Sequence, residues 1–257
     1  MNQSSKKQSN GFNEMKAAPE TLKYSVIACD VFKEELESLG GEKPPWSGIQ
    51  YLEMGLHDQP DLLRKSISIA LRKLEMNASI EAIVFVYGLC GTGLVGISPS
   101  RCPIIIPRAH DCVSILLGSP KRHSEILQKY PEAYFYSPGW VRGKRAPGPD
   151  REKHLRAFYT QRYGDDQELV DELLEADKES FAHHNCAAYV DLTQNEKAED
   201  YCKSCAHSLG WKFRKLEGDP RLLHDLLYGP WDDKRFLIVQ PGRSIALSTD
   251  SKVLREQ

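Results

Sequence analysis

The charges of this 257-residue chain nearly balance, with 34 Lys and Arg against 36 Asp and Glu and a net charge of −2. This balance argues against nucleic acid as the main partner, because nucleic-acid-binding domains carry an excess of positive charge. No apolar run approaches the ~20 residues that span a bilayer, so we expect no membrane partner. The first residues lack the apolar segment of a secretory signal, and we expect a cytoplasmic protein.

The length suits one large domain or two smaller lobes, and the sequence patterns favour two. Residues 1–21 are rich in Ser, Asn, Gln and Lys, and we expect a disordered tail there. Residues 22–141 are predicted to form a first α/β lobe that carries the site. Residues 142–185 are predicted to be a connector with helices, and residues 186–257 a second, smaller α/β lobe.

Short apolar runs alternate with amphipathic stretches along the first predicted lobe, which is the pattern of parallel strands joined by helices. The runs that predict strands are Tyr24–Cys29, Ile49–Glu53, Ile83–Val86, Ile104–Ile106 and Glu132–Tyr136. The stretches that predict helices are Val31–Leu39, Pro60–Glu75, Val113–Leu117 and Arg122–Tyr130.

The alternation continues to the end of the chain. Helices are predicted at Leu155–Tyr163, Gln167–Glu179, Glu196–Leu209 and Pro220–Leu227, and strands at Cys186–Val190, Lys212–Leu216 and Phe236–Val239. The sequence therefore predicts an α/β fold with mainly parallel sheets, helices on both faces and two Rossmann-like lobes.

Thiol and imidazole groups follow the first four predicted strands. Cys29 ends the first strand, His57 follows the second, Cys90 follows the third, and His110 and Cys112 follow the fourth. The carboxyl ends of neighbouring parallel strands lie on one edge of a sheet, ~4.8 Å apart, so ligands from three strands can reach a common ion. These groups are zinc ligands, and we predict a metal site of these five residues. A set of three cysteines can also hold an Fe–S cluster.

The same residues have simpler interpretations. Free cysteines are often buried and merely pack in the core. His57 can contribute to the start of its helix, and Asp111 can cap the following helix or orient His110. Cys202-x-x-Cys205 lies inside a predicted helix with no second pair nearby, so we interpret both residues as structural.

The predicted third strand is followed by a glycine-rich turn. Gly91-x-Gly93-x-x-Gly96 has the form of a dinucleotide-binding motif, but another strand-like run begins within ten residues of Gly93. We therefore interpret Gly91 and Gly93 as residues that let the backbone approach a ligand or cofactor closely. Arg108 can pair with an anionic substrate or be a surface charge.

His110-x-Cys112 with a distant cysteine resembles the zinc sites of thiol-activating methyltransferases, where the metal holds a substrate thiol as the nucleophilic thiolate. In those sites the distant cysteine lies downstream. Here Cys29 and Cys90 lie upstream, so the resemblance concerns the ligand chemistry.

Six short motifs identify the chain as similar to the DUF1638 family, over roughly Lys23–Gly242. Members occur in methanogens and anaerobic bacteria, often beside corrinoid-dependent methyl-transfer systems, so the resemblance implies a setting in C1 metabolism. The motifs are Ile27-Ala-Cys-Asp30, Leu52-Glu-Met-Gly-Leu-His57, Tyr87-Gly-Leu-Cys-Gly91, Ile106-Pro-Arg-Ala-His-Asp-Cys112, Leu116-Leu-Gly-Ser119 and Pro138-Gly-Trp140.

Two functions of different classes stay open. The first is a metal-binding enzyme, with zinc as the leading metal, that activates a thiol or accepts a methyl group from a small-molecule substrate. The second is a non-catalytic accessory protein that binds or delivers a metal, an Fe–S cluster or a corrinoid for a corrinoid or methyltransferase protein. The sequence does not decide whether the chain is an enzyme, because no general acid–base pair stands out beside the cysteines.

Overall fold

The structure, a computed structural model, describes residues 22–164, 166–250 and 252–257. The tail expected over residues 1–21 lies outside these ranges. The chain is mixed α/β and divides into two compact units. Unit 1 contains the described part of residues 1–29 together with residues 39–115 and 221–257, and unit 2 contains residues 30–38 and 116–220.

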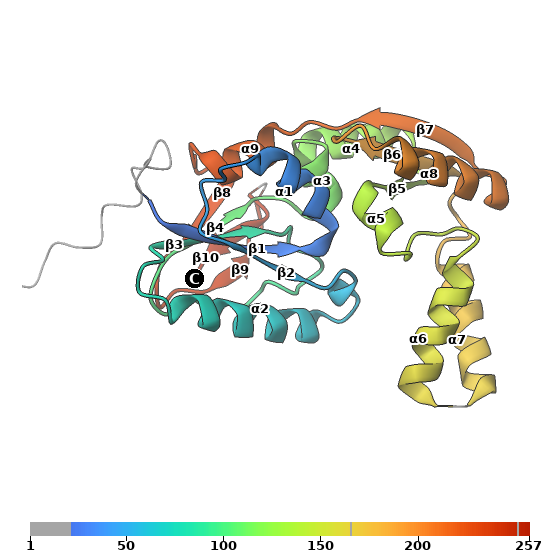
Figure 1. The fold of residues 1–257 in the computed structure, drawn as a ribbon, viewed down its shortest axis with the longest axis horizontal. Coiled ribbons are helices and arrows are strands. Elements are labelled where there is room, and N and C mark those ends of the chain that lie inside the picture. The colour runs from blue at the N-terminus through green and yellow to red at the C-terminus, as the bar shows by residue number, and fades with distance from the viewer. Residues whose placement is uncertain (1–21, 165, 251) are drawn as a thin grey trace, which may run out of the picture. The chain divides into compact units, whose positions relative to one another are not determined.

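Unit 1 is built on a mainly parallel sheet of five strands in the order β2-β1-β3-β4-β8. Its three central strands are buried along their whole length, as parallel strands covered on both faces require. Helices α2 and α9 lie on opposite sides of the sheet (Figure 1). The bounds are β1 Tyr24–Cys29, β2 Ile49–Leu52, β3 Ala82–Val86, β4 Ile104–Pro107, α2 Pro60–Glu75 and α9 Arg221–Tyr228.

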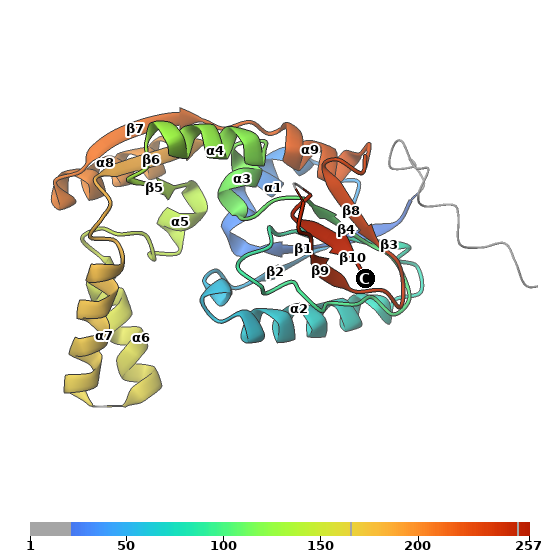
Figure 2. The ribbon, with the colours of Figure 1, turned by 180° about the vertical axis from the view of Figure 1, so that it is seen from behind.

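The last strands differ from the expected arrangement. β8 (Phe236–Val239) pairs antiparallel with β4, so residues 221–257 complete unit 1 rather than a second lobe. β9 (Ile245–Leu247) and β10 (Leu254–Glu256) form an antiparallel pair in the same unit (Figure 2). The expected boundary at residue 186 therefore does not separate the two units.

Unit 2 has a parallel sheet of three strands in the order β5-β6-β7. Its helices at Pro120–Lys129 and Glu196–Leu209 begin at capping residues. The Ser119 hydroxyl accepts the Arg122 N–H at 3.1 Å, and the Asn195 side chain accepts the Ala198 N–H at 3.1 Å. The bounds are β5 Ala133–Tyr136, β6 Cys186–Asp191, β7 Lys212–Glu217, α4 Pro120–Lys129, α5 Pro138–Arg142 and α8 Glu196–Leu209.

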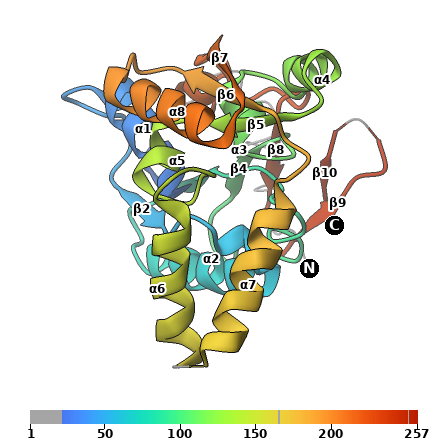
Figure 3. The same cartoon turned by 90° about the vertical axis from the view of Figure 1, so that its right-hand side faces the viewer.

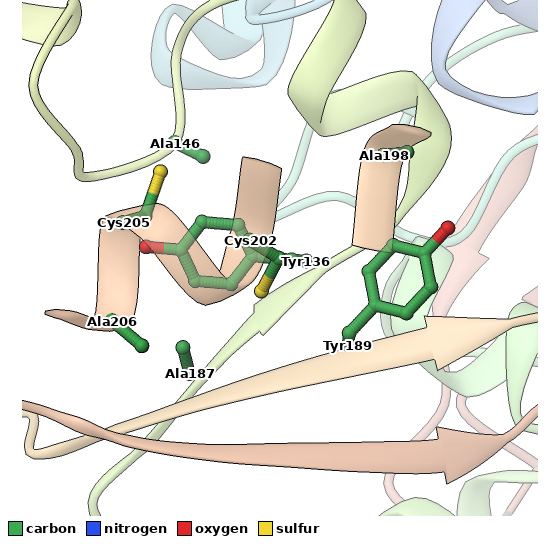
Figure 4. Packing of buried hydrophobic residues seen from close by; sticks show 8 residues of the cluster. All are labelled: Tyr136, Ala146, Ala187, Tyr189, Ala198, Cys202, Cys205 and Ala206. Carbon is green, nitrogen blue, oxygen red and sulfur yellow. The ribbon is translucent and has the colours of Figure 1, made fainter. Parts of the chain in front are cut away.

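Cys202 and Cys205 belong to the core between α8 and this sheet (Figure 4). Both are fully buried beside Tyr136, whose hydroxyl donates to the Pro147 carbonyl at 2.6 Å. This confirms their interpretation as structural residues.

Helices α6 (Arg151–Tyr163) and α7 (Gln167–Ser180) form an antiparallel hairpin within unit 2 that extends away from its sheet (Figure 3). Two further short elements, α1 (Lys33–Gly40) and α3 (Cys112–Leu116), follow β1 and β4 along the chain. No helix among the described residues is long and apolar enough to cross a membrane.

Candidate functional site

The candidate site lies at the carboxyl ends of β1, β3 and β4, which are parallel neighbours in unit 1. The register pairs Ala28 of β1 with Val86 of β3. Cys29, the last residue of β1, is therefore level with Tyr87, the first residue after β3. The sheet thus brings a thiol and a phenol together at the edge where ligands of parallel α/β sheets usually bind.

Beyond β3 and β4, the two following loops stay side by side. The N–H groups of Leu89 and Cys90 donate to the carbonyls of Ala109 and His110, at 2.8 and 3.0 Å. Gly88 allows this approach, because a Cβ atom there would lie 2.6 Å from the backbone N and Cα atoms of Asp111. The glycine therefore fixes the spacing between the loop that carries Cys90 and the loop that leads to Cys112.

Cys90 has an unusual backbone conformation, with φ at +48°, and Gly91 follows with φ at +69°. The left-handed region costs a non-glycine residue roughly 1–2 kcal/mol, so the tertiary structure must hold Cys90 in place. Gly93 has a different reason to be glycine, because a Cβ atom there would meet the Leu63 side chain at 2.5 Å. The expectation that Gly91 and Gly93 bind a cofactor stays a prediction.

Arg64 of α2 holds the glycine-rich turn from the other side. Its Nε donates to the Val95 carbonyl at 2.7 Å, and its Nη2 donates to the Thr92 carbonyl at 3.1 Å. This role of Arg64 was not predicted from the sequence, because nothing local in the sequence joins α2 to a turn that follows β3.

The thiols of Cys29, Cys90 and Cys112 act on one another electrostatically. Burial raises the pKa of the Cys90 thiol to about 12, and Cys29 and then Asp111 add to this effect. Burial also raises the pKa of Cys112 well above its usual value, with further contributions from Cys90 and Cys29. The two thiols are therefore neutral at pH 7, and the three sulfur atoms share one poorly solvated region.

Tyr87 completes this group. Its side chain is only 3% exposed, and its hydroxyl has no oxygen or nitrogen partner in the part of the chain that the structure describes. Burial raises the pKa of Tyr87 most, and Cys29, Cys90 and Cys112 all contribute. The thiol of Cys29 also hydrogen-bonds with this hydroxyl. We call Cys29, Cys90, Cys112 and Tyr87 the thiol cluster.

Asp111 caps the short helix α3. Its Oδ1 accepts the N–H of Ser114 at 2.7 Å and the hydroxyl of Ser114 at 2.8 Å. Of the two roles considered for Asp111, the structure therefore shows the helix cap.

The two predicted histidine ligands have exposed side chains. His57 lies in a short 3-10 helix (Leu56–Asp58), with its Nε2 3.4 Å from Asp58 Oδ1. Across residues 22–164, 166–250 and 252–257, no group of three or more His, Cys, Asp or Glu side chains is arranged to hold a metal ion. The structure therefore brings the three cysteines together but does not arrange the five predicted ligands around one point.

Arg108 is buried and makes its contacts within the protein rather than as a surface charge. Its Nε donates to the carbonyls of Asp233 and Phe236 at 2.8 and 3.2 Å. Its Nη1 donates to the Leu254 carbonyl, and its Nη2 lies 2.8 Å from Asp233 Oδ1. These bonds tie the C-terminal segment to β4, so we leave Arg108 out of the proposed site.

A hollow of about 970 Å³ lies at the carboxyl ends of β6 and β7 in unit 2. Lys215 lines it, with its Nζ 2.7 Å from Asp191 Oδ2 and 2.6 Å from Glu199 Oε2. This hollow was not predicted from the sequence, because its charged residues have the pattern of an ordinary solvated surface along the chain.

Comparison with known proteins assigns the chain to a family. The family model described as "Protein of unknown function (DUF1638)" matches residues 51–227. The chain belongs to the DUF1638 family. This confirms the resemblance drawn from the short motifs. No curated protein and no solved structure matches the chain.

The DUF1638 segment contains most of the thiol cluster. Tyr87, Cys90 and Cys112 lie within residues 51–227, whereas Cys29 lies before them. The DUF1638 description names no reaction, so the function must be argued from the cluster itself.

Proposed function

We propose that the thiol cluster binds a thiophilic metal ion, with zinc as the leading metal, and presents it to a small substrate that carries a thiol or a methyl group. The observation that carries this proposal is the meeting of three thiols and a buried hydroxyl at the carboxyl edge of three adjacent parallel strands. Cysteine sulfur suits zinc, and three protein ligands leave a fourth position for a substrate. When bound, zinc would hold a substrate thiol as the thiolate.

Metal binding requires a local change of side-chain conformation. The cluster is not arranged around an ion in the described residues. Rotation of a cysteine side chain to another staggered conformation moves its sulfur atom without a change of the backbone. His110 is a candidate additional ligand, because its backbone is already bonded to Cys90 and its side chain is exposed. His57 stays a predicted ligand without a contact to support it.

The alternative function is a non-catalytic accessory protein that binds or delivers a metal, an Fe–S cluster or a corrinoid. One observation favours it. Asp111, the carboxylate that raises the pKa of both Cys90 and Cys112, is engaged as a helix cap by Ser114. It is therefore poorly placed to serve as a general base for a bound thiol.

The wider setting of the proposal follows from the family resemblance. We propose a role in anaerobic C1 or methyl-transfer metabolism, in the cytoplasm, with a small molecule or a corrinoid or methyltransferase protein as partner. We also interpret the two α/β units as Rossmann-like lobes. The parallel strands of both sheets support this interpretation.

The test is metal analysis of protein purified without air and without a metal-affinity tag. We expect about one zinc per chain in the wild type and loss of most of it in the Cys90→Ser and Cys112→Ser variants. Cys102→Ser is the matched control. Cys102 is a buried thiol of unit 1, whereas Cys90 and Cys112 are half-buried, and it precedes β4 and so lies at the opposite edge of the sheet.

The outcomes separate the alternatives. Iron with a broad visible absorption band would favour an Fe–S cluster over zinc. Zinc that remains at the wild-type level in both site variants would refute the assignment of these residues. Turnover of a small thiol or methyl donor by the purified protein alone would exclude the non-catalytic alternative.

A further inference from the structure

The α6–α7 hairpin has a small core of its own. Leu155, Val170 and Leu174 are buried between the two helices, and Tyr159 packs against them. At the base of the hairpin, the guanidinium of Arg151 binds both carboxylate oxygens of Asp177, at 2.7 and 2.5 Å. These contacts define which side of each helix faces the other.

One flank of the hairpin is closed by ion pairs. Arg156 Nη1 lies 2.6 Å from Asp171 Oδ1, and Lys178 Nζ lies 2.9 Å from Glu175 and 3.3 Å from Glu152. Arg156, Asp171 and Glu175 each follow directly after an inward residue. A step of one residue turns ~100° around a helix, so these residues project to one side of the hairpin.

The opposite flank is mostly apolar, although the exposed His154, which precedes Leu155, also lies on it. Phe158, Leu169 and Leu173 each come directly before an inward residue, namely Tyr159, Val170 and Leu174. Both helices are right-handed and they run in opposite directions, so one step back along either chain turns toward the same side. Phe158 is 40% exposed, and the two leucines are half-buried. We call these three residues the apolar flank.

The two helices carry opposite charge. α6 contains four Lys and Arg residues and one acidic residue, whereas α7 contains six acidic residues and one Lys. Several of these charges belong to the ion pairs of the opposite flank or to the Arg151–Asp177 pair. Outside those pairs, α6 keeps Lys153 and Arg162, and α7 keeps Glu168, Glu172 and Glu179. Each hairpin therefore presents the apolar flank between a basic helix and an acidic helix. Such a surface is complementary to a second copy of itself, if the basic helix of one copy lies on the acidic helix of the other.

We propose that the apolar flank is a self-association surface, through which two copies of the chain form an antiparallel four-helix arrangement. A twofold axis parallel to the helices places α6 of one copy on α7 of its partner and pairs opposite charges. A twofold axis in the interface but perpendicular to the helices places α6 on α6 and pairs like charges. The charge distribution therefore selects the first arrangement, with Phe158 packed against the partner's leucine pair.

The size of the flank sets the strength of the association. A helix of 13 residues is about 20 Å long, and two adjacent helices are about 20 Å wide, so a hairpin face offers about 400 Å². The dimer would bury about 800 Å² in total, which is below the size of a standard stable interface. The dimer is therefore expected to be weak, with a dissociation constant in the micromolar range.

The test is analytical ultracentrifugation of the full chain from 1 to 200 µM at about 0.15 M salt. We expect a concentration-dependent monomer–dimer equilibrium that weakens at 0.5 M salt, because salt screens the charge pairing. Phe158→Ser is expected to raise the dissociation constant at least tenfold. Circular dichroism of the variant checks that the helices stay folded.

Tyr163→Ser is the matched control. Tyr163 is a similarly exposed aromatic residue of α6, at 45%, but it lies four residues after the inward Tyr159 and so on the face toward α7 rather than on the apolar flank. The rings of Phe158 and Tyr163 both lie near that of Tyr159, at 5.6 and 6.2 Å. This variant is expected to dimerise like the wild type. A wild type that stays monomeric at 200 µM would refute the proposal, as would a dimer that both substitutions weaken equally or that high salt strengthens.

Discussion

The buried carboxyl group of Glu35 in α1 should make the stability of the folded protein depend on pH. Its side chain is 2% exposed, and neither carboxylate oxygen has a hydrogen-bond partner within the described residues. Burial raises the pKa of Glu35 to about 8, while its own backbone N–H and then Arg142 oppose this effect and Glu34 adds to it. The carboxyl group is therefore protonated in the folded protein at pH 7, whereas an unfolded chain would ionise it.

The sign of the effect follows from proton binding. The folded state holds the proton more tightly than the unfolded state, whose glutamate pKa is 4.5. The stabilisation is therefore complete below pH 4.5 and is lost as the pH rises through 8. With these two values, the contribution falls by about 3 kcal/mol between pH 5.5 and pH 8.5.

The assay is urea unfolding of the wild type and of Glu35→Gln at these two pH values, which avoid the isoelectric point near 6.5. Glutamine keeps the size of the side chain but cannot ionise. The stability difference between wild type and variant should therefore shift against the wild type by about 3 kcal/mol from pH 5.5 to pH 8.5. Glu37→Gln is the control, since Glu37 is exposed on the same helix and should show no such shift. A difference for Glu35→Gln that is independent of pH would refute the reasoning.

Three other substitutions test the site and its surroundings. Gly88→Ala should lower the free energy of unfolding by more than 2 kcal/mol, because its Cβ would meet backbone atoms at 2.6 Å, whereas Gly48→Ala, with open space around it, should cost less than 1 kcal/mol. Urea unfolding measures both, and equal effects would contradict the close approach of the two loops. Arg108→Met should cost about 2–4 kcal/mol in the same assay, because it removes the donors of several buried carbonyls; a loss below 1 kcal/mol would contradict its role in holding the C-terminal segment. Tyr87→Phe should stabilise metal-free protein by about 1 kcal/mol, because it removes a buried hydroxyl that lacks an oxygen or nitrogen partner. A loss of stability would show that the contact of this hydroxyl with the Cys29 thiol outweighs the cost of burying it.

The sequence predicted the local elements well and their assembly less well. The strands β1, β3 and β4 were predicted close to their observed bounds because their apolar residues leave little other choice. The pairing of β8 with β4 was not predicted, because it joins segments more than 120 residues apart and no local pattern encodes it. The last strand predicted for the second lobe, Phe236–Val239, therefore belongs to unit 1.

At the candidate site, too, local patterns predicted part of the arrangement and the long-range contacts were missed. The meeting of Cys29, Cys90 and Cys112 was predicted because parallel neighbours share one edge of the sheet. The contacts of Arg108 were not predicted, because its partners all lie more than 120 residues further along the chain. Tyr87 was also missed, although the signal was present: a phenol directly after a fully buried strand is level with the end of the neighbouring strand.

Two energetically unfavourable features of the thiol cluster favour its interpretation as a ligand-binding site rather than as ordinary core packing. If position 87 only had to fill the core, phenylalanine would bury the same ring without a hydroxyl that lacks an oxygen or nitrogen partner. If position 90 only had to fit the fold, glycine would adopt its left-handed backbone conformation at a lower energy than cysteine. Both costs fall on groups that can contact a ligand, and both groups lie at one edge of one sheet. A site that binds a metal or a substrate recovers such costs when the ligand is bound, whereas a site that only packs does not.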